Sequence, residues 1–245
     1  MTTLYLIRHG QTDNNLRGTF NGAESDLPLN ETGLEMAASL TEAFADIPLD
    51  AIYSSPIRRA YMTAEGVRGS RDMPILTDPD LMEMHFGEWN GMTFPDIKRL
   101  YPEAAKCWLR AEKHFKAPDS HEDSHDVSVR VFRAILRIIR AHRGGTVAIA
   151  SHGFALHMWI TRALQLPLSQ YRRIAGLHNV SYGVVEIEDD GHFTVREWNK
   201  RDHYHPELLP TPRRSRVRKM MKKILGRRYF HPAFKIQKVR KNHAD

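Results

Sequence analysis

The chain has 245 residues, a formal net charge of +7 and 27% charged residues, and its mean hydropathy is −0.50. This length suffices for one large α/β domain with a buried core, and no apolar stretch is long enough to span a bilayer. Cys107 is the only cysteine, which excludes an intrachain disulfide. Because no basic-then-apolar signal region precedes the first strand pattern, we expect a cytoplasmic protein.

The positive charge is concentrated toward the C-terminus. From Asn199 onward there are fifteen Lys and Arg residues against three Asp and Glu, which leaves 21 against 26 in the preceding residues. We therefore expect a mildly acidic domain over residues 1–200 and a basic extension over residues 201–245. Apolar residues at helical spacing predict an amphipathic helix at 213–226 within this extension. These apolar residues are Val217, Met220, Met221, Ile224 and Leu225.

Three interpretations of this helix stay open. Its apolar face packs on the domain, or the helix lies on an anionic membrane surface, or it supports self-association with another subunit. On an anionic membrane, each basic residue near the surface contributes on the order of 1 kcal/mol. Basic charge alone gives only salt-sensitive, non-specific contact with nucleic acid, so no specific nucleic-acid partner is expected.

The first predicted element is a buried strand at residues 4–7, which ends in Arg8, His9 and Gly10. Ligands of open α/β sheets bind at the carboxyl ends of strands. Arg8 offers a planar fork of donors that matches phosphate. His9 can act as a nucleophile near neutral pH, and Gly10 lets the backbone approach a ligand.

Helix and strand patterns alternate along the following residues. The segment 17–30 is rich in Gly, Asn and Asp, which predicts a loop. Ser55 and Pro56 predict the N-cap and first position of a helix. Arg59 then falls in the first turn, where anions bind favourably, and Arg58 is expected on the surface. Other runs predict helices at 34–44, 124–142 and 154–164, two short helices after Thr93, strands at 49–53 and 146–150, and a hairpin of residues 180–187 and 193–198.

A second histidine follows the strand at 146–150, in the run Ser151, His152, Gly153. Two apolar strands that each end in His-Gly imply adjacent parallel strands with both imidazoles in one pocket. Between them, Glu83 is a lone carboxylate among Met82, Met84 and Phe86. Apolar neighbours disfavour the charged form of an acid, as a general acid near neutral pH requires. Glu83 is therefore the candidate acid.

The segment 114–126 contains three histidines among acidic residues. Their spacing matches no metal-ligand signature, so no metal site is assigned. In the helix that follows, Val131 and its apolar neighbours form the core face, and the arginines, Arg130 among them, are expected on the solvated side.

Five stretches in order resemble the histidine phosphatase superfamily, which includes the cofactor-dependent phosphoglycerate mutases. They begin with the Arg-His-Gly run at residue 8 and end with the stretch around Asn179, so that the resemblance covers about residues 1–200. It implies an α/β three-layer sandwich, phosphoglycerate mutase-like, in which a mostly parallel central sheet has helices on both faces. The other three stretches are 54–60, 81–91 and 150–153.

The resemblance also implies the site. It places the phosphate arginine immediately before an alanine, at Arg59, and the acid at Glu83. Two departures are Asn21, where glutamine is expected, and residues 119–122, where the family usually has Gly-Gly-Glu-Ser. The implied catalytic residues are His9, Glu83, His152, Arg8 and Arg59. The implied substrate-binding residues are Arg8, Gly10, Asn15, Asn21, Arg59, His152, Gly153 and Asn179.

These residues predict a metal-independent and cofactor-free phosphatase, which hydrolyses a small phosphorylated metabolite through a phosphohistidine. The stretch 86–97 resembles the phosphatase branch, because it lacks the long Tyr- and Arg-rich insert that mutases place after the acid. Two alternatives stay open. One is a phosphoglycerate-mutase-like phosphotransferase, and the other is a catalytically silent module that binds a phosphorylated ligand.

Overall fold

A six-stranded sheet forms the centre of the protein, with the strand order β3-β2-β4-β1-β5-β6. The computed structural model describes residues 1–204, so the predicted helix at 213–226 and all but the first residues of the extension lie outside the described residues. Strands β3, β2, β4 and β1 run parallel to one another, whereas β5 is antiparallel to both β1 and β6. The strands are β1 (Thr2–Arg8), β2 (Ala51–Ser54), β3 (Ile75–Thr77), β4 (Thr146–Ser151), β5 (Tyr182–Ile187) and β6 (Phe193–Lys200).

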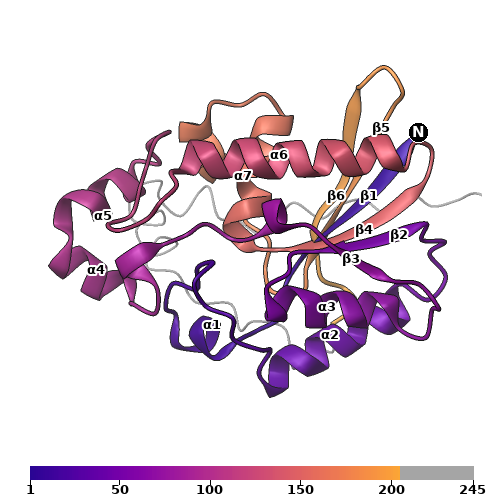
Figure 1. Ribbon diagram of the computed structural model, residues 1–245, viewed down its shortest axis with the longest axis horizontal. Helices are drawn as coiled ribbons and strands as arrows, with labels where there is room; N and C mark the ends of the chain where they lie inside the picture. The colour runs from indigo at the N-terminus through magenta and orange to yellow at the C-terminus, as the bar shows by residue number, and fades with distance from the viewer. Residues whose placement is uncertain (205–245) are drawn as a thin grey trace, which may run out of the picture. The chain divides into compact units, whose positions relative to one another are not determined.

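Helices cover both faces of this sheet (Figure 1), which confirms the predicted three-layer α/β sandwich with a mostly parallel sheet. Two separate apolar cores lie between the layers, one under α2 and α3 and the other under α6 and α7. The covering helices are α2 (Glu31–Ala43) and α3 (Arg58–Arg68) on one face, and α6 (Ser124–Ala141) and α7 (Gly153–Ala163) on the other.

Shorter helices lie beyond the ends of the strands. The predicted pair after Thr93 is present, and Thr93 accepts the backbone N–H of Asp96 as the N-cap. The short helices are α1 (Asp13–Arg17), α4 (Phe94–Leu100) and α5 (Pro102–Leu109), with 3₁₀ turns at Pro79–Leu81, Gly87–Trp89 and Leu168–Arg173. No helix described within residues 1–204 is both long and apolar enough to cross a membrane.

The predicted start of α3 is wrong. The helix begins at Arg58, its N-cap is Ile57, and no side chain caps it. The Ser55 hydroxyl instead bonds to the imidazole of His152 at 2.8 Å, from the end of the adjacent strand. The Ser-Pro pattern predicts a helix cap, but here the Ser55 hydroxyl orients His152 instead. Arg59 still lies in the first turn, as expected.

Candidate active site

The two histidines lie at the carboxyl ends of neighbouring strands. Strands β1 and β4 pair in parallel with Arg8 opposite Ser151, and the His9 N–H continues the ladder to the Ser151 carbonyl at 2.9 Å. The ring centroids of His9 and His152 are 5.2 Å apart. The strand register thus brings the two distant His-Gly runs together, as predicted. His9 lines the cleft described below, whereas His152 is fully buried and is not among the residues that line it.

His9 is 2% exposed, and its ring orientation is fixed by one backbone contact. Nδ1 lies 2.7 Å from the Gly10 carbonyl oxygen, which makes Nδ1 the protonated nitrogen and leaves the Nε2 lone pair free. Burial, and then the charges of Arg59 and Arg8, lower the pKa of His9 well below its usual range. The ring is therefore neutral at physiological pH.

His152 is fully buried beside His9, and its Nε2 is paired with the Ser55 hydroxyl. Burial first, followed by the charge of Arg59, lowers the pKa of His152 well below its usual range. In this form it contributes a dipole and a hydrogen-bonding nitrogen rather than a positive charge. The positive charge at the site therefore has to come from other residues.

Two buried guanidinium groups supply the positive charge. Arg59 donates to the carbonyls of Ser25, Asn21 and Gly22, and burial lowers its pKa to about 10, so it stays cationic at neutral pH. Arg8 donates to the Leu177 carbonyl at 2.7 Å. Each of these arginines retains a buried Nε–H that no described protein atom accepts.

Glu83 is a buried carboxylate held by the first turn of α7. Its oxygens accept the N–H groups of Phe154 at 3.0 Å, Ala155 at 2.9 Å and Met84 at 3.0 Å. The carboxylate thus satisfies N–H groups that a helix N-terminus leaves unpaired, where His152 is an N-cap without a side-chain bond. The apolar neighbours of Glu83 are evident from the sequence, but two of these three N–H donors come from a distant helix and are not.

Arg130 contradicts the expectation of a solvated side chain. It pairs with both oxygens of Glu122 at 2.8 Å and donates to the carbonyls of Asp80, Met82 and Glu83. It therefore fixes the backbone on which Glu83 lies. Glu122 also accepts the N–H of His85, so the segment that departs from the family pattern braces the same loop. Helical periodicity alone assigns such an arginine to the outer face of α6, since its partners come from distant residues.

We expect Arg130→Lys to lower the free energy of unfolding by about 1.5–3 kcal/mol, because an ammonium cannot replace the bidentate pair and the carbonyl contacts together. It should also lower kcat by displacing Glu83. Arg133→Lys, on the exposed side of the same helix, is the matched control and should change neither quantity. Denaturant unfolding and steady-state phosphate release measure both, and equal behaviour of the two variants would contradict the positioning role.

The predicted binding residues divide into those that line the cleft and those that do not. Asn15, Asn21, Gly153 and Asn179 line it together with Arg8, His9 and Glu83, whereas Gly10, Arg59 and His152 are not among its lining residues. The Asn179 amide donates to the carbonyls of His9 and Gly10 and to the Asn15 side chain, so its N–H groups hold the loop after β1. The side-chain amide of Asn21 donates to Thr12 at 3.0 Å.

Two of the predicted glycines are required by close packing. A Cβ on Gly153 would lie 3.1 Å from Arg8 Nε, so Gly153 leaves room for that guanidinium. A Cβ on Gly10 would lie 2.8 Å from the Gly33 carbonyl oxygen, at the start of α2. Gly10 is outside the described lining of the cleft, and its small size is required by the neighbouring helix rather than by a ligand approach.

Sequence reasoning missed the aromatic wall of the cleft. The cleft has a volume of ≈ 710 Å³. Trp108 lines the cleft, with its ring centroid 5.5 Å from that of Phe20 and 5.2 Å from that of Phe154, and the Arg172 guanidinium lies over its ring. No local motif marks the residues of this wall, which come from five separate segments. The aromatic and cationic wall residues are Phe20, Phe86, Trp108, Phe154, Tyr171 and Arg172.

The two buried imidazoles predict a pH dependence of stability. Their pKa values are lowered in the folded protein, so below about pH 6.5 the unfolded chain binds more protons than the folded one. Stability is therefore fully present above that pH and falls as the pH falls, by about 1.4 kcal/mol per pH unit for each imidazole. Denaturant unfolding from about pH 7.5 to 5.5 should show a shallower slope for His152→Asn, and an unchanged slope would contradict the assignment.

Two imidazoles, two buried guanidinium groups and a carboxylate gather near the carboxyl ends of the parallel strands, and these side chains are suited to binding and processing a phosphate group. The amino-acid sequence matches the model of the histidine phosphatase superfamily (branch 1) over residues 4–201, and the chain belongs to this family. The predicted family membership is thereby confirmed.

Individual relatives agree with this assignment. A metal-independent phosphoserine phosphatase of Arabidopsis thaliana is 30% identical over 207 residues, 83% of this chain and 83% of that protein. Among solved structures, YhfR of Bacillus stearothermophilus is 33% identical with a TM-score of 0.77, over 83% of this chain and 99% of that chain. Phosphoserine phosphatase of Entamoeba histolytica, in complex with 3-phosphoglyceric acid, is 27% identical with a TM-score of 0.75, over 83% and 99% of the two chains. The chain is a phosphatase, a phosphoric monoester hydrolase of the histidine phosphatase type.

Proposed function

We propose that the chain hydrolyses a small phosphomonoester in two steps, with His9 as the nucleophile. The observation that supports this most is the orientation of the His9 ring. Because Nδ1 is bonded to the Gly10 carbonyl oxygen at 2.7 Å, Nε2 is the nitrogen free to attack, and the lowered pKa of His9 keeps that nitrogen unprotonated.

In the first step, Nε2 of His9 forms a bond to phosphorus while the bond from phosphorus to the ester oxygen breaks. For this step Glu83 must carry a proton when the ester is bound; it gives that proton to the departing oxygen, and the alcohol leaves. In the second step, Glu83 takes a proton from water, whose oxygen attacks phosphorus as the bond to Nε2 breaks. Inorganic phosphate leaves, and both His9 and Glu83 return to their starting protonation states.

The arginines stabilise the charge that the phosphoryl group carries between the two steps. Arg8 and Arg59 are fixed by backbone carbonyls, so their charges need no reorganisation during the reaction. The buried nitrogens without a described partner are Arg8 Nε, Arg59 Nε and His152 Nδ1. Phosphoryl oxygens are acceptors that suit these nitrogens, which supports substrate-binding roles for all three residues.

The substrate is proposed to be a small phosphorylated metabolite. The phosphoserine phosphatase of Entamoeba histolytica, a structural relative, is solved in complex with 3-phosphoglyceric acid, and a mutant of the same protein is solved in complex with phosphoserine. The cleft of ≈ 710 Å³ accommodates such a molecule beside the aromatic wall. Phosphoserine and phosphoglycerate are therefore the first substrates to assay.

The test is a parallel assay of phosphate release and of phosphoryl transfer. Purified protein is incubated with p-nitrophenyl phosphate, phosphoserine and phosphoglycerates, and both inorganic phosphate and interconverted phosphoglycerates are measured. We expect stoichiometric phosphate release. Interconversion without release would identify a mutase-like phosphotransferase, and binding without either product would identify a silent ligand-binding module.

We further propose that the protein is cytoplasmic and that the basic extension is dispensable for phosphate release but mediates surface binding or self-association. Tyr204 is buried in the core under α2 and α3, so truncation should leave it in place. A chain that ends after Tyr204 is expected to keep wild-type kcat and to bind anionic vesicles less than the full chain does. Equal vesicle binding by both chains would contradict the membrane role, and sedimentation of both chains tests self-association.

A further inference from the structure

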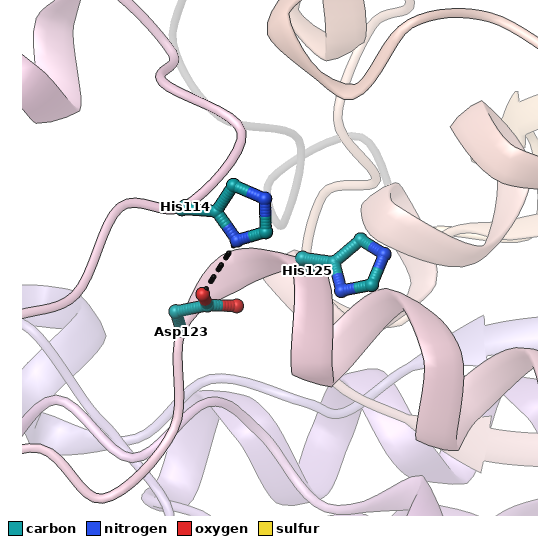
Figure 2. Close-up of side chains that lie close together, drawn as sticks. All are labelled: His114, Asp123 and His125. Carbon is teal, nitrogen blue, oxygen red and sulfur yellow. Dashed lines mark hydrogen bonds and ion pairs between the residues drawn. The ribbon is translucent and has the colours of Figure 1, made fainter.

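Outside the catalytic cleft, two histidines and an aspartate meet where the loop after α5 returns to α6. Each of these residues, His114, Asp123 and His125, offers one donor atom, and the three atoms all lie within 4.8 Å of one another. Figure 2 shows that His114 comes from the loop, while Asp123 and His125 come from the start of α6. Their sequence spacing alone assigns no metal, but the fold gathers the three donors at one point.

The backbone around these three residues is fixed. The Ser124 N–H donates to the Phe115 carbonyl at 2.9 Å, and the Phe115 N–H donates to the Ser124 hydroxyl at 3.1 Å. Phe115 is 3% exposed, so its ring anchors the loop in the core. Because Phe115 and Ser124 are the chain neighbours of the three donors, this clamp holds the loop against the helix.

Asp123 is oriented by its own contacts. Its Oδ1 accepts the N–H of Asp126 at 2.9 Å as the N-cap of α6, and its Oδ2 lies 2.8 Å from His114 Nδ1. One carboxylate oxygen is thus committed to the helix, and the other faces an imidazole. The charges of Asp123 and Asp126 offset the positive end of the helix dipole, which by itself would disfavour a cation.

We propose that His114, Asp123 and His125 bind one divalent transition-metal ion of the zinc class. Two imidazole nitrogens with one carboxylate oxygen are a donor set that suits Zn²⁺, whereas Mg²⁺ and Ca²⁺ take oxygen ligands. Zinc bonds of about 2.0–2.1 Å place tetrahedral ligand atoms about 3.3 Å apart. Side-chain rotation would therefore open the 2.8 Å pair of His114 and Asp123 slightly and bring His125 toward the ion. The side chain of His114 is 60% exposed, which gives the ion a path from solvent and leaves the fourth position to water.

The ion would brace one wall of the catalytic cleft without taking part in the reaction. The Phe115 ring lies 5.1 Å from that of Trp108, which lines the cleft, and none of the three donor residues lines it. The proposal therefore goes beyond the phosphatase activity and stands independently of the catalytic mechanism.

The test is titration of EDTA-treated full-length protein with Zn²⁺ by calorimetry, and with Co²⁺ by visible absorption, which reports the coordination geometry. We expect His114→Ala and His125→Ala to weaken the site by about 10–100-fold or abolish it. Asp123→Asn should do the same while it keeps the helix cap, because Asn is an equally good N-cap. His121→Ala, from the same loop but outside the cluster, is the matched control and should bind the ion as wild type does.

The catalytic imidazoles need a separate control. The His9→Ala variant lacks an imidazole that could hold an ion at the cleft. When it is titrated with Zn²⁺, the proposed site should bind the ion as in the wild type. The proposal is overturned if wild-type protein shows no saturable Zn²⁺ binding, or if His114→Ala and His125→Ala bind Zn²⁺ with wild-type affinity and stoichiometry.

Discussion

His9→Ala is expected to lower kcat by about 10⁴-fold or more while the fold is retained, because covalent catalysis loses its nucleophile. No described side chain replaces it. His152 is fully buried and its Nε2 is paired with Ser55, so it cannot reach phosphorus through that nitrogen. Phosphate release with p-nitrophenyl phosphate and phosphoserine measures the loss, and circular dichroism monitors the fold.

His157→Ala is the matched control, since it removes another imidazole from the lining of the same cleft. His157 Nε2 lies 3.0 Å from the Ile174 carbonyl oxygen, so its ring stabilises the wall of the cleft and is not expected to contact the phosphoryl group. We expect its loss to change KM more than kcat. Turnover by His9→Ala close to that of wild type would remove the basis of the proposed mechanism.

Glu83→Gln is expected to give the second largest effect, and that effect should depend on the leaving group. A general acid contributes about 10²–10⁴-fold to a reaction that needs protonation of the departing oxygen. An alkyl phosphate such as phosphoserine should lose about this factor, whereas p-nitrophenyl phosphate, whose phenolate leaves unaided, should lose far less. The ratio of the two kcat/KM losses is the measurement.

The ratio separates acid catalysis from a structural effect. Both oxygens of Glu83 accept backbone N–H groups, so an amide turned toward Phe154 places donor against donor and lowers stability as well. A loss of stability alone would lower kcat/KM by the same factor for both substrates. Glu88→Gln, at an exposed neighbouring position, is the control, and equal losses for both substrates in Glu83→Gln would direct the search for the acid to Glu88.

The parts of the fold that the sequence predicted are those with local signals. Strands β1 and β4 are apolar runs that end in His-Gly, and parallel pairing places such ends together. The long helix α6 was predicted within one residue because its apolar face repeats at helical spacing. Strand β3 was missed because three residues, Ile75–Thr77, are too few to show a period.

The parts of the site that the sequence could not predict depend on distant partners. Arg130 has the helical position of a solvated residue, and only the fold brings Glu122 and the Glu83 backbone to it. Asn179 was expected as a pocket donor, but its amide protons are engaged by the loop after β1. The role of Gly10 was also missed, because its close packing against Gly33 joins two segments that are separate in the sequence.

The central claim is that the phosphoryl group is covalently held by Nε2 of His9 between the two steps. The most direct measurement is rapid quenching of the protein with a ³²P-labelled phosphomonoester, followed by peptide mapping. We expect one acid-labile, base-stable label on the peptide that contains His9, and no label in His9→Ala. Turnover with a label on any other residue, or with an acid-stable label, would contradict the account.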